Sequence, residues 1–470
     1  MMRFPAVGVA LRIAGGLALI ALVAFAGIAG SAANSQESQT VSVVASWTGS
    51  EGADFTAVLR KFTNQTGIKV NYTGTRALDQ LLQSDIQQGN PPDLAILPSP
   101  GTLLSYAQRG YLTPLDARHP VLQPKLTEAY DAQWLSIMRL GTDHIYTLPV
   151  KADLQNLVWY NPKLLAGDSV PGQTKQTSWA DLTSLEGAIT AKGGTPWCLG
   201  MDSPPTSGWL GTDWISDILL HQSGTNAYQQ WANGTLSWTS PQVEAAWQAW
   251  GSLVTRAKQV NGGSLGALVT NWADAGEPMF TSPANCSLQY VPSFITVEYG
   301  EFPERPKAGA GYNFFPSPMT GLPDATSTGA SDAWNVSADL LGMFHDTPAA
   351  RQLVQYLAGT EAQGIWPHIR AGGAASANSQ VKLDVYPDKV DATIAQIMNN
   401  PGATLCFNAS DLMPPTMQNA FYEGVMEYLW DPGQLTAILH RLEKVRQAVY
   451  QPKNAFQSLP TFTCGTPAAG

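Results

Sequence analysis

The stretch VSVVASWTGSEGADFTAVLRKFTNQTGIKVNYTG (residues 41–74) decides the fold. Its first seven residues form an apolar run that predicts a short buried strand. Beyond a turn-like segment, apolar side chains recur at the spacing of a helix, at Phe55, Val58, Leu59 and Phe62. Gly67 then ends the helix, and alternation predicts a second strand, with apolar side chains at Ile68, Val70 and Tyr72. The stretch therefore predicts a β-α-β unit.

The same pattern continues along the chain to Gly110. Leucine and isoleucine at helical spacing predict a second helix over residues 78–86, and residues 94–97 predict a third strand. A β-α-β-α-β order implies a parallel sheet with helices on both faces, and ligands of such sheets bind beyond the carboxyl ends of the strands. Those ends carry aromatic, acidic, basic and hydroxyl side chains, over residues 47–52, 72–76 and 98–101. This mixture suits a polar, neutral ligand.

Length and a tryptophan-rich middle segment indicate a second lobe. The chain has 470 residues, which is enough for two domains. Nine of its 15 tryptophans lie within residues 179–272, where several segments have helical spacing. We expect a mostly helical lobe there, with Trp247 and Trp250 in its core.

The N-terminal segment has the pattern of a secretory signal. Arg3 and Arg12 are the only charged residues before Glu37, residues 13–30 are apolar or small, and Ser-Ala-Ala follows at residues 31–33. We expect residues 1–33 to be a cleaved signal peptide. An uncleaved membrane anchor is the alternative, because the apolar run is just long enough to span a bilayer.

Export makes the four cysteines candidates for disulfide bonds. An even number of cysteines in an oxidising compartment favours disulfides, and four cysteines allow three pairings. No C-x2-C spacing supports a metal site instead. We prefer the pairs Cys198–Cys286, which would bracket the middle lobe, and Cys406–Cys464, which would pin the C-terminal tail.

Composition and motifs argue against nucleic-acid binding and catalysis. The chain has 26 Lys and Arg against 36 Asp and Glu, a net charge of −10, and no run of basic residues. It has no phosphate-binding loop, zinc-protease or calcium-loop motif. Residues 262–266 match G-x-S-x-G, but a predicted helix stands before the serine where the motif needs a strand. We therefore expect a monomeric, non-enzymatic protein without cofactor or metal.

Three segments of the chain are FTNQTGIKV (62–70), NPPDLAILPSPG (90–101) and LPVKADLQNLVWYN (148–161). In this order they resemble successive parts of the bacterial extracellular solute-binding proteins of family 1, the ABC-importer receptors that include the maltose-binding proteins. Residues 195–220, 338–359 and 410–414 are similar to the alpha-glucoside-binding branch. One departure is Ser337-Ala338-Asp339, where the family often has Gly-Gly-Asp.

The resemblance implies an α/β, two-lobed periplasmic-binding-protein fold, each lobe a sheet flanked by helices, with the ligand cleft between the lobes. The first lobe is expected at 41–152 plus about 290–335, and the second at about 153–289 plus about 336–470. The implied function is that of an exported receptor, periplasmic or extracellular, that closes on an alpha-glucoside or oligosaccharide and delivers it to an ABC transporter permease in the membrane.

Two other functions stay open. An exported glycoside-active hydrolase also needs aromatic side chains and paired carboxylates, which any two acids could supply in a fold. A receptor for a non-sugar solute, such as a polyamine or iron, is the third interpretation. Turnover separates a sugar receptor from a hydrolase, because a receptor releases its sugar unchanged.

The candidate ligand-binding residues are aromatic and polar, because sugar sites combine ring faces with planar hydrogen-bonding groups. From the first lobe and the crossing segment we select Trp47, Ser50, Glu51, Arg76, Ser99, Lys151 and Asp153. From the second lobe we select Trp209, Asp213, Trp214 and Asp411.

Each candidate also has a structural interpretation. Trp209 or Trp214 could lie in the core of the second lobe, and Glu51 could simply stabilise a helix N-terminus. Arg76 could pair with Asp79 on a helix surface. Lys151 and Asp153 could be ordinary hinge charges, and Asp411 could cap a turn.

Overall fold

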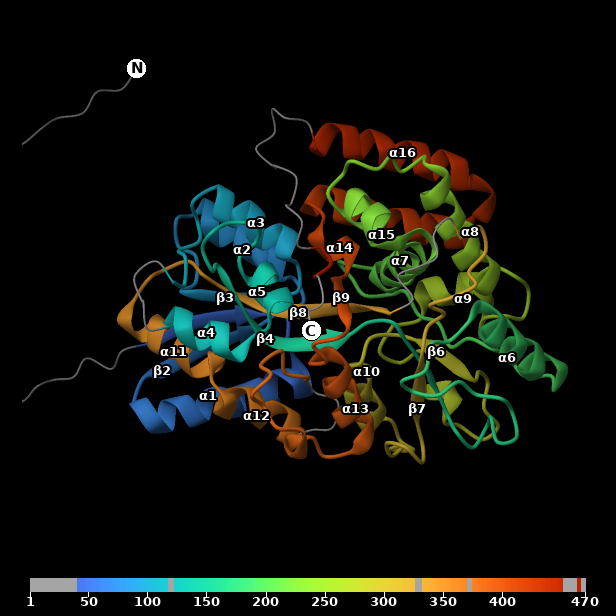
Figure 1. The fold of residues 1–470 in the computed structure, drawn as a ribbon, viewed down its shortest axis with the longest axis horizontal. Helices are drawn as coiled ribbons and strands as arrows, with labels where there is room; N and C mark the ends of the chain where they lie inside the picture. The colour runs from blue at the N-terminus through green and yellow to red at the C-terminus, as the bar shows by residue number, and fades with distance from the viewer. Residues whose placement is uncertain (1–39, 117–121, 326–331, 370–373, 451–462, 466–470) are drawn as a thin grey trace, which may run out of the picture. The chain divides into compact units, whose positions relative to one another are not determined.

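Two β-sheets organise the chain (Figure 1). The computed structural model describes residues 40–116, 122–325, 332–369, 374–450 and 463–465, so the expected signal peptide lies outside the described residues. The larger sheet has the strand order β2-β1-β3-β8-β4, with β9 paired to β8, and the smaller has the order β6-β5-β7. The expected α/β architecture of two sheets flanked by helices is confirmed.

The strands of the larger sheet are β1 (Thr40–Ala45), β2 (Lys69–Gly74), β3 (Leu94–Leu97), β4 (Thr147–Leu154), β8 (Ala333–Met343) and β9 (Thr404–Phe407). Those of the smaller sheet are β5 (Leu157–Tyr160), β6 (Leu288–Tyr290) and β7 (Asn313–Pro316). Around the larger sheet lie α1 (Gly49–Thr66), α2 (Leu78–Gln87), α3 (Pro100–Gln108), α4 (Leu122–Ala129), α5 (Ala132–Met138), α11 (Pro348–Ala358), α12 (Thr360–Ile369) and α13 (Lys389–Met398). The other helices are α6 (Trp179–Ala191), α7 (Trp209–Ala232), α8 (Pro241–Val254), α9 (Gly263–Val269), α10 (Ile295–Glu301), α14 (Ala409–Leu412), α15 (Pro415–Trp430) and α16 (Leu435–Val449).

The predicted β-α-β-α-β unit forms as expected. Strand β1 pairs in parallel with both β2 and β3, and α1 and α2 connect them. Helix α1 ends at Gly67, whose φ of 76° lies in the left-handed region that glycine adopts without strain. The helix begins earlier than predicted, at Gly49, so Ser50 and Glu51 belong to its first turn rather than to a loop.

Strand β8 differs from the simple parallel pattern. It pairs antiparallel with β3 on one side and with β4 on the other, and its first residues pair in parallel with β9. This long strand therefore lies between β3 and β4 inside the larger sheet, although it is about 240 residues away from β3 in sequence. All eight residues of its partner β4 are buried.

The chain crosses between the sheets at Gln155 and Asn156. These two residues separate β4 of the larger sheet from β5 of the smaller sheet. The strand pairing also differs from the expected lobe boundaries. Strand β7 lies within 290–335 but pairs with β5, and β8 pairs with the first-lobe strands although most of it lies beyond 335. We propose that β8 and β9 belong to the first lobe, because hydrogen bonding between strands joins them to β3 and β4.

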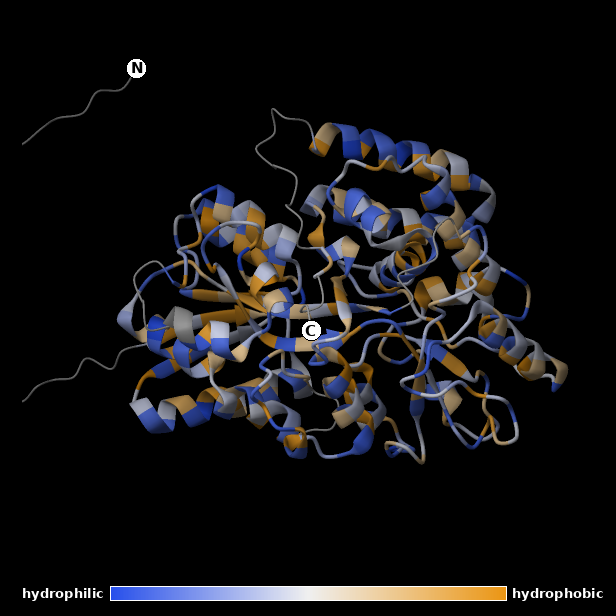
Figure 2. Ribbon diagram, viewed as in Figure 1, coloured by the Kyte–Doolittle hydropathy of each residue, from blue (hydrophilic) through white to orange (hydrophobic). Residues whose placement is uncertain are grey.

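Apolar packing is concentrated between the layers. Figure 2 colours the central strands largely orange, whereas the outermost helix α16 is mainly blue with a narrow apolar side. That side buries Leu435, Ile438, Leu439 and Leu442, and α16 contacts α15 through it. Trp247 and Trp250 are fully buried, as expected.

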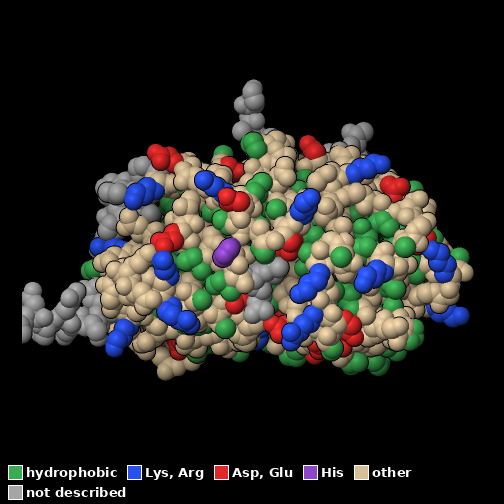
Figure 3. Space-filling view, turned by 90° about the horizontal axis from the view of Figure 1, so that it is seen from below, with side chains coloured by type: hydrophobic (Ala, Val, Ile, Leu, Met, Phe, Trp, Pro, Cys, Tyr) green, Lys and Arg blue, Asp and Glu red, His purple; other side chains and the backbone are tan. Residues whose placement is uncertain are grey.

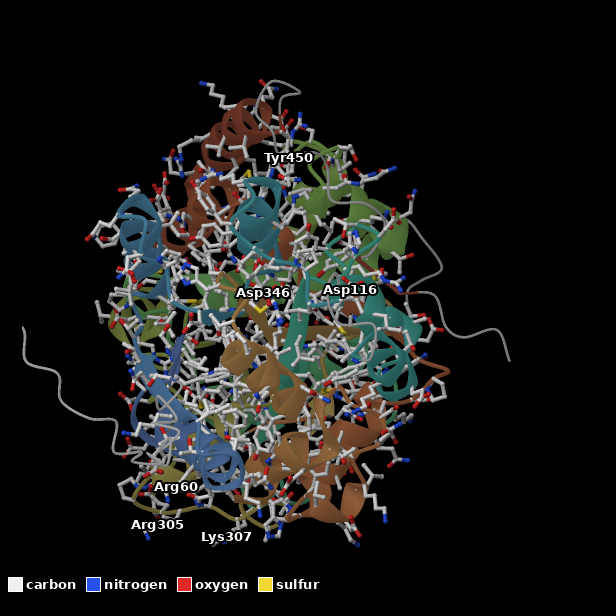
Figure 4. The ribbon with its side chains drawn as sticks, turned by 90° about the vertical axis from the view of Figure 1, so that its left-hand side faces the viewer. Arg60, Asp116, Arg305, Lys307, Asp346 and Tyr450 are labelled. Atoms are coloured by element: carbon white, nitrogen blue, oxygen red, sulfur yellow. A yellow bond between two sulfur atoms is a disulfide. The ribbon has the colours of Figure 1, made fainter. Side chains whose placement is uncertain are left out.

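Charged side chains are dispersed over the surface. In Figure 3, blue and red side chains alternate across the face shown, without a large area of one sign. In Figure 4, Arg60 of α1 and the loop residues Arg305 and Lys307 lie at the periphery. None of the helices in the described part of the chain has the length and apolar character needed to cross a membrane.

Two disulfide bonds join the cysteines in the pairing that we prefer from the sequence. Cys198 is bonded to Cys286 across 88 residues, and Cys406 to Cys464 across 58 residues. The first pair lies beside β6, where the backbone N–H of Cys198 donates to the carbonyl of Leu288 at 2.8 Å. The second fastens residues 463–465 beside β9, since Phe407 donates to the carbonyl of Thr463.

We predict that the double substitution Cys406→Ser/Cys464→Ser lowers the free energy of unfolding by about 2–4 kcal/mol, because the unfolded chain regains the freedom of a long closed loop. Urea unfolding of the oxidised wild type and the variant measures the difference. Peptide mapping without reductant should give linked peptides for the two pairs named above. A Cys198–Cys406 peptide or four free thiols would contradict the pairing.

Candidate ligand-binding cleft

A cavity of about 360 Å³ lies beyond the carboxyl ends of the first-lobe strands and reaches residues of the second lobe. Nine of the eleven candidate residues line it: Trp47, Glu51, Arg76, Ser99, Lys151, Asp153, Trp209, Asp213 and Asp411. The structure therefore brings together side chains that are up to about 360 residues apart in sequence.

The ammonium of Lys151 is the centre of a buried ion cluster. Its Nζ lies 2.9 Å from Oε1 of Glu51 and 4.0 Å from Oδ2 of Asp153, and the side chain is 2% exposed. The ring of Phe294 lies 4.9 Å from Nζ. Burial lowers the pKa of Lys151, but the carboxylates of Asp153, Glu51 and Asp339 outweigh burial and raise that pKa above its ordinary value.

Glu51 binds two cations at once. Besides Lys151, it accepts a bond of 3.1 Å from Nη2 of Arg76. Burial raises the pKa of Glu51, but Lys151 and Arg76 together hold that pKa below its ordinary value. Glu51 thus lines the cavity, as expected of a ligand-binding candidate. It also stands in the first turn of α1, where a carboxylate stabilises the helix N-terminus. Among the described residues, the ion pair that Arg76 forms is with Glu51 and not with Asp79.

Asp153 ties the crossing segment to the smaller sheet. The hydroxyl of Ser293, just after β6, donates to Oδ1 of Asp153 at 3.1 Å and accepts from the N–H of Leu154 at 3.1 Å. Burial raises the pKa of Asp153, while Lys151 and Ser293 act in the opposite direction. We refer to Lys151, Glu51, Asp153 and Arg76 as the Lys151 cluster.

Asp339 faces the cluster from the neighbouring strand β8, directly opposite Lys151 in the register. Its Oδ2 accepts from Nε1 of Trp47 at 3.1 Å. Burial raises the pKa of Asp339 to about 7, although Lys151 acts to lower it. Trp47 is 2% exposed, so it supports this carboxylate more than it offers a face to the cavity.

The second lobe contributes Asp213 from α7 and Asp411 from α14. Asn408 donates to Asp213, and Nε2 of Gln418 donates to Oδ1 of Asp411 at 3.1 Å. Burial raises the pKa of both carboxyl groups, and neighbouring carboxylates raise the pKa of each further. With Asp339 they form the set that we call the acidic wall.

Helix α14 contacts the chain where β3 leads into α3. The hydroxyl of Ser99 caps helix α3 and donates to the carbonyl oxygen of Asp411 at 3.0 Å. Gly101 packs here without a side chain, since a Cβ at this position would lie 2.2 Å from the carbonyl oxygen of Met413. The contact places the acidic wall beside the strand ends of the first lobe.

Three aromatic rings form the apolar part of the cavity. The ring centroids of Trp209 and Trp272 are 5.6 Å apart, and Phe294 lies 6.0 Å from Trp209 and 5.5 Å from Trp272. All three rings are partly exposed and line the cavity. They can offer apolar faces to a ligand opposite the hydrogen-bonding groups.

Two candidates lie outside the cavity. Trp214 is fully buried, stacked on Tyr290 at 4.5 Å and edge-on to Trp197 at 4.7 Å, so it belongs to the second-lobe core. Five residues separate it from Trp209, which turns the two side chains to different faces of α7. Ser50 does not line the cavity although its neighbour Glu51 does, since successive side chains of a helix are turned by about 100° from each other.

Sequence reasoning missed several lining residues, among them Trp272, Phe294, Asp339 and Tyr422. Asp339 stands opposite Lys151 because of the register of β8 against β4, which joins distant parts of the chain, so local periodicity does not mark it. Trp272 and Phe294 lie in irregular segments without periodicity, so no local pattern marks them. Among the described residues, no group of three or more His, Cys, Asp and Glu side chains is arranged so that it could hold a metal ion.

Comparison with known proteins places this arrangement in a family. The profile described as bacterial extracellular solute-binding protein matches residues 45–364. The osmoprotective compounds-binding protein GgtB of Synechocystis sp. is 32% identical over 416 residues, 86% of this chain and 91% of that protein. The alpha-glucosides-binding periplasmic protein AglE of Rhizobium meliloti is 29% identical over 399 residues, 83% of each chain.

Solved structures share the fold. The bacterial solute receptor AcbH, described as having an exclusive preference for β-D-galactopyranose, superposes with a TM-score of 0.73 at 16% identity, covering 88% of this chain and 100% of that one. A chitin oligosaccharide binding protein superposes with a TM-score of 0.71 at 18% identity, covering 88% and 99%. The profile match, the relatives and the fold agree with the resemblance seen in the sequence, and the chain belongs to the bacterial extracellular solute-binding protein family, whose members are solute receptors of ABC importers.

Proposed function

We propose that this protein binds an alpha-glucoside or short oligosaccharide in the cavity, closes its lobes around it, and delivers it unchanged to a membrane permease. The observation that carries the proposal is the composition of the cavity: three aromatic rings stand beside carboxylates held in place by buried hydrogen bonds. A sugar without charge needs this combination, because its affinity comes from ring stacking and many hydrogen bonds rather than ion pairs.

The size of the cavity favours a small ligand. Its volume of about 360 Å³ lies at the lower end of the range for small-molecule sites. It equals the volume of about 12 liquid water molecules, which is room for about two sugar rings rather than a long polysaccharide chain. The names of the two relatives, which bind osmoprotective compounds and alpha-glucosides, agree with a ligand of this size.

Lobe closure follows from the way both lobes contribute to the cavity. Glu51 and Arg76 come from the first lobe, whereas Trp209 and Asp411 come from the second. A ligand that touches both sets binds the closed arrangement better than the open one, and this difference shifts the population towards closure. We place the hinge at residues 155–156, where the chain passes from β4 to β5.

A glycoside hydrolase stays the competing function, because Asp213 and Asp411 are neighbouring carboxyl groups with raised pKa values in the same cavity. Family members are binding proteins, and binding without turnover is the outcome that we expect.

A panel of maltose, trehalose, sucrose and raffinose tests the proposal by thermal unfolding and chromatography. We expect at least one sugar to raise the melting temperature, by mass action on the folded state, and to be recovered intact after long incubation. Shorter products would support the hydrolase instead. If no carbohydrate shifts the melting temperature, the proposed ligand class is wrong.

Trp209→Ala should weaken binding of the best sugar by about 2 kcal/mol, roughly thirtyfold, because a buried aromatic anchor is lost. Calorimetric titration measures the change. Trp430→Ala is the matched control, since Trp430 is 69% exposed at the end of α15 and lies outside the cavity. Unchanged affinity in folded Trp209→Ala would contradict the assignment of this ring to the site.

Trp214→Ala should instead reduce stability, by about 3–5 kcal/mol, because it leaves a void in the second-lobe core. Urea unfolding checks this. A Trp214→Ala protein that is as stable as the wild type but binds sugar poorly would return Trp214 to the list of ligand contacts.

A further inference from the structure

The charges of the cavity are divided into two groups. In the Lys151 cluster, the carboxylates of Glu51 and Asp153 are compensated by Lys151 and Arg76 within 4.0 Å. In the acidic wall, the carboxyl groups accept hydrogen bonds from neutral side chains: Asp339 from Trp47, Asp213 from Asn408, and Asp411 from Gln418.

The cations that line the cavity are already paired. Lys151 and Arg76 are the Lys and Arg side chains among the described residues that line the cavity, and both bind Glu51. Lys151 is 2% exposed, and Arg76 is about half exposed. An incoming anion would therefore meet three carboxyl groups, together with two cations whose charge Glu51 and Asp153 already compensate.

We propose, building on the receptor function above, that the site takes uncharged carbohydrates, tolerates amino sugars, and excludes sugar acids and sugar phosphates. The acidic wall selects by charge: its oxygens accept hydrogen bonds from sugar hydroxyls or from a sugar ammonium, and repel a carboxylate or a phosphate. Repulsion is strong when these groups are ionised, because Asp213 and Asp339 are buried and Asp411 is partly buried, and water screens such charges poorly.

The selection should depend on pH with a definite sign. Burial raises the pKa of all three wall carboxyls, that of Asp339 to about 7 and that of Asp411 to about 8, so Asp339 and Asp411 lose their negative charge as the pH falls through the neutral range. Exclusion of anions should therefore be stronger at alkaline than at acidic pH. The other charged groups near the wall, on every adjoining element, are Glu51, Arg76, Asp79, Lys151, Asp153, Asp217 and Glu298.

The experiment compares one neutral disaccharide that binds in the panel, such as maltose or trehalose, with two derivatives of it. One derivative carries a carboxylate in place of a hydroxymethyl group, and the other an ammonium in place of a hydroxyl. Calorimetry at about pH 8.5 should show the carboxylate derivative binding at least about tenfold more weakly than its parent, and the ammonium derivative about as tightly. At about pH 6 the penalty on the carboxylate derivative should shrink.

Isosteric variants assign the effect to the wall. Asp339→Asn and Asp411→Asn should each reduce the penalty on the carboxylate derivative, and two independent sites guard against one variant failing to fold. Asp384→Asn is the matched control: it makes the same change in net charge at an exposed residue outside the cavity and should leave the penalty unchanged.

The outcomes separate this inference from the function on which it rests. If no neutral sugar binds, the receptor function fails. If a neutral sugar binds and its carboxylate derivative binds equally well, charge selection alone is wrong. Equal losses for the carboxylate and ammonium derivatives would show discrimination by size, and would also overturn the inference.

Discussion

The buried ammonium of Lys151 is the constraint on which the cavity depends. It stands 2% exposed between Glu51 of α1 and Asp153 of its own strand, with Asp339 opposite on β8. Removing a single partner from such a cluster leaves an uncompensated buried charge, which typically costs about 3–5 kcal/mol. The cluster therefore fixes the positions of three chain segments relative to one another. Through Arg76 it extends to the rim of the cavity, and through Ser293 to the smaller sheet.

The Lys151 cluster and the acidic wall have different roles in the cavity, because only the Lys151 cluster contains cations that compensate its carboxylates. The cations and carboxylates of the Lys151 cluster bind one another, so the cluster shapes the cavity without attracting charged ligands. The acidic wall keeps acceptor oxygens whose burial is costly in the empty protein. Buried acceptor groups without a charged partner are expected at functional sites rather than in a structural core. The aromatic cluster of Trp209, Trp272 and Phe294 then supplies the apolar surface that the carboxylates lack.

Local sequence patterns predict much of the first lobe, because its β-α-β units bury apolar faces with a simple period. They also predict that Trp47, Glu51, Arg76 and Ser99 meet at one cavity, since residues that follow the carboxyl ends of parallel strands share an edge. What they miss depends on long-range pairing. Strand β8 joins the first sheet from more than 200 residues away, so neither the lobe boundaries nor Asp339 follow from local periodicity. Trp214 and Trp209 are equally suited by their chemistry to stack on a sugar. Only the orientation of α7 places Trp214 in the core and Trp209 at the cavity.

A crystal structure of the protein with the neutral sugar that most raises its melting temperature tests the central claim most directly. The account predicts an intact sugar in the cavity, with the C–H face of one ring against Trp209 or Trp272. Its hydroxyls should lie within hydrogen-bond distance of Asp339 or Asp411, with contacts from both lobes. A sugar bound elsewhere on the chain, or a cleaved glycosidic bond in the cavity, would contradict it.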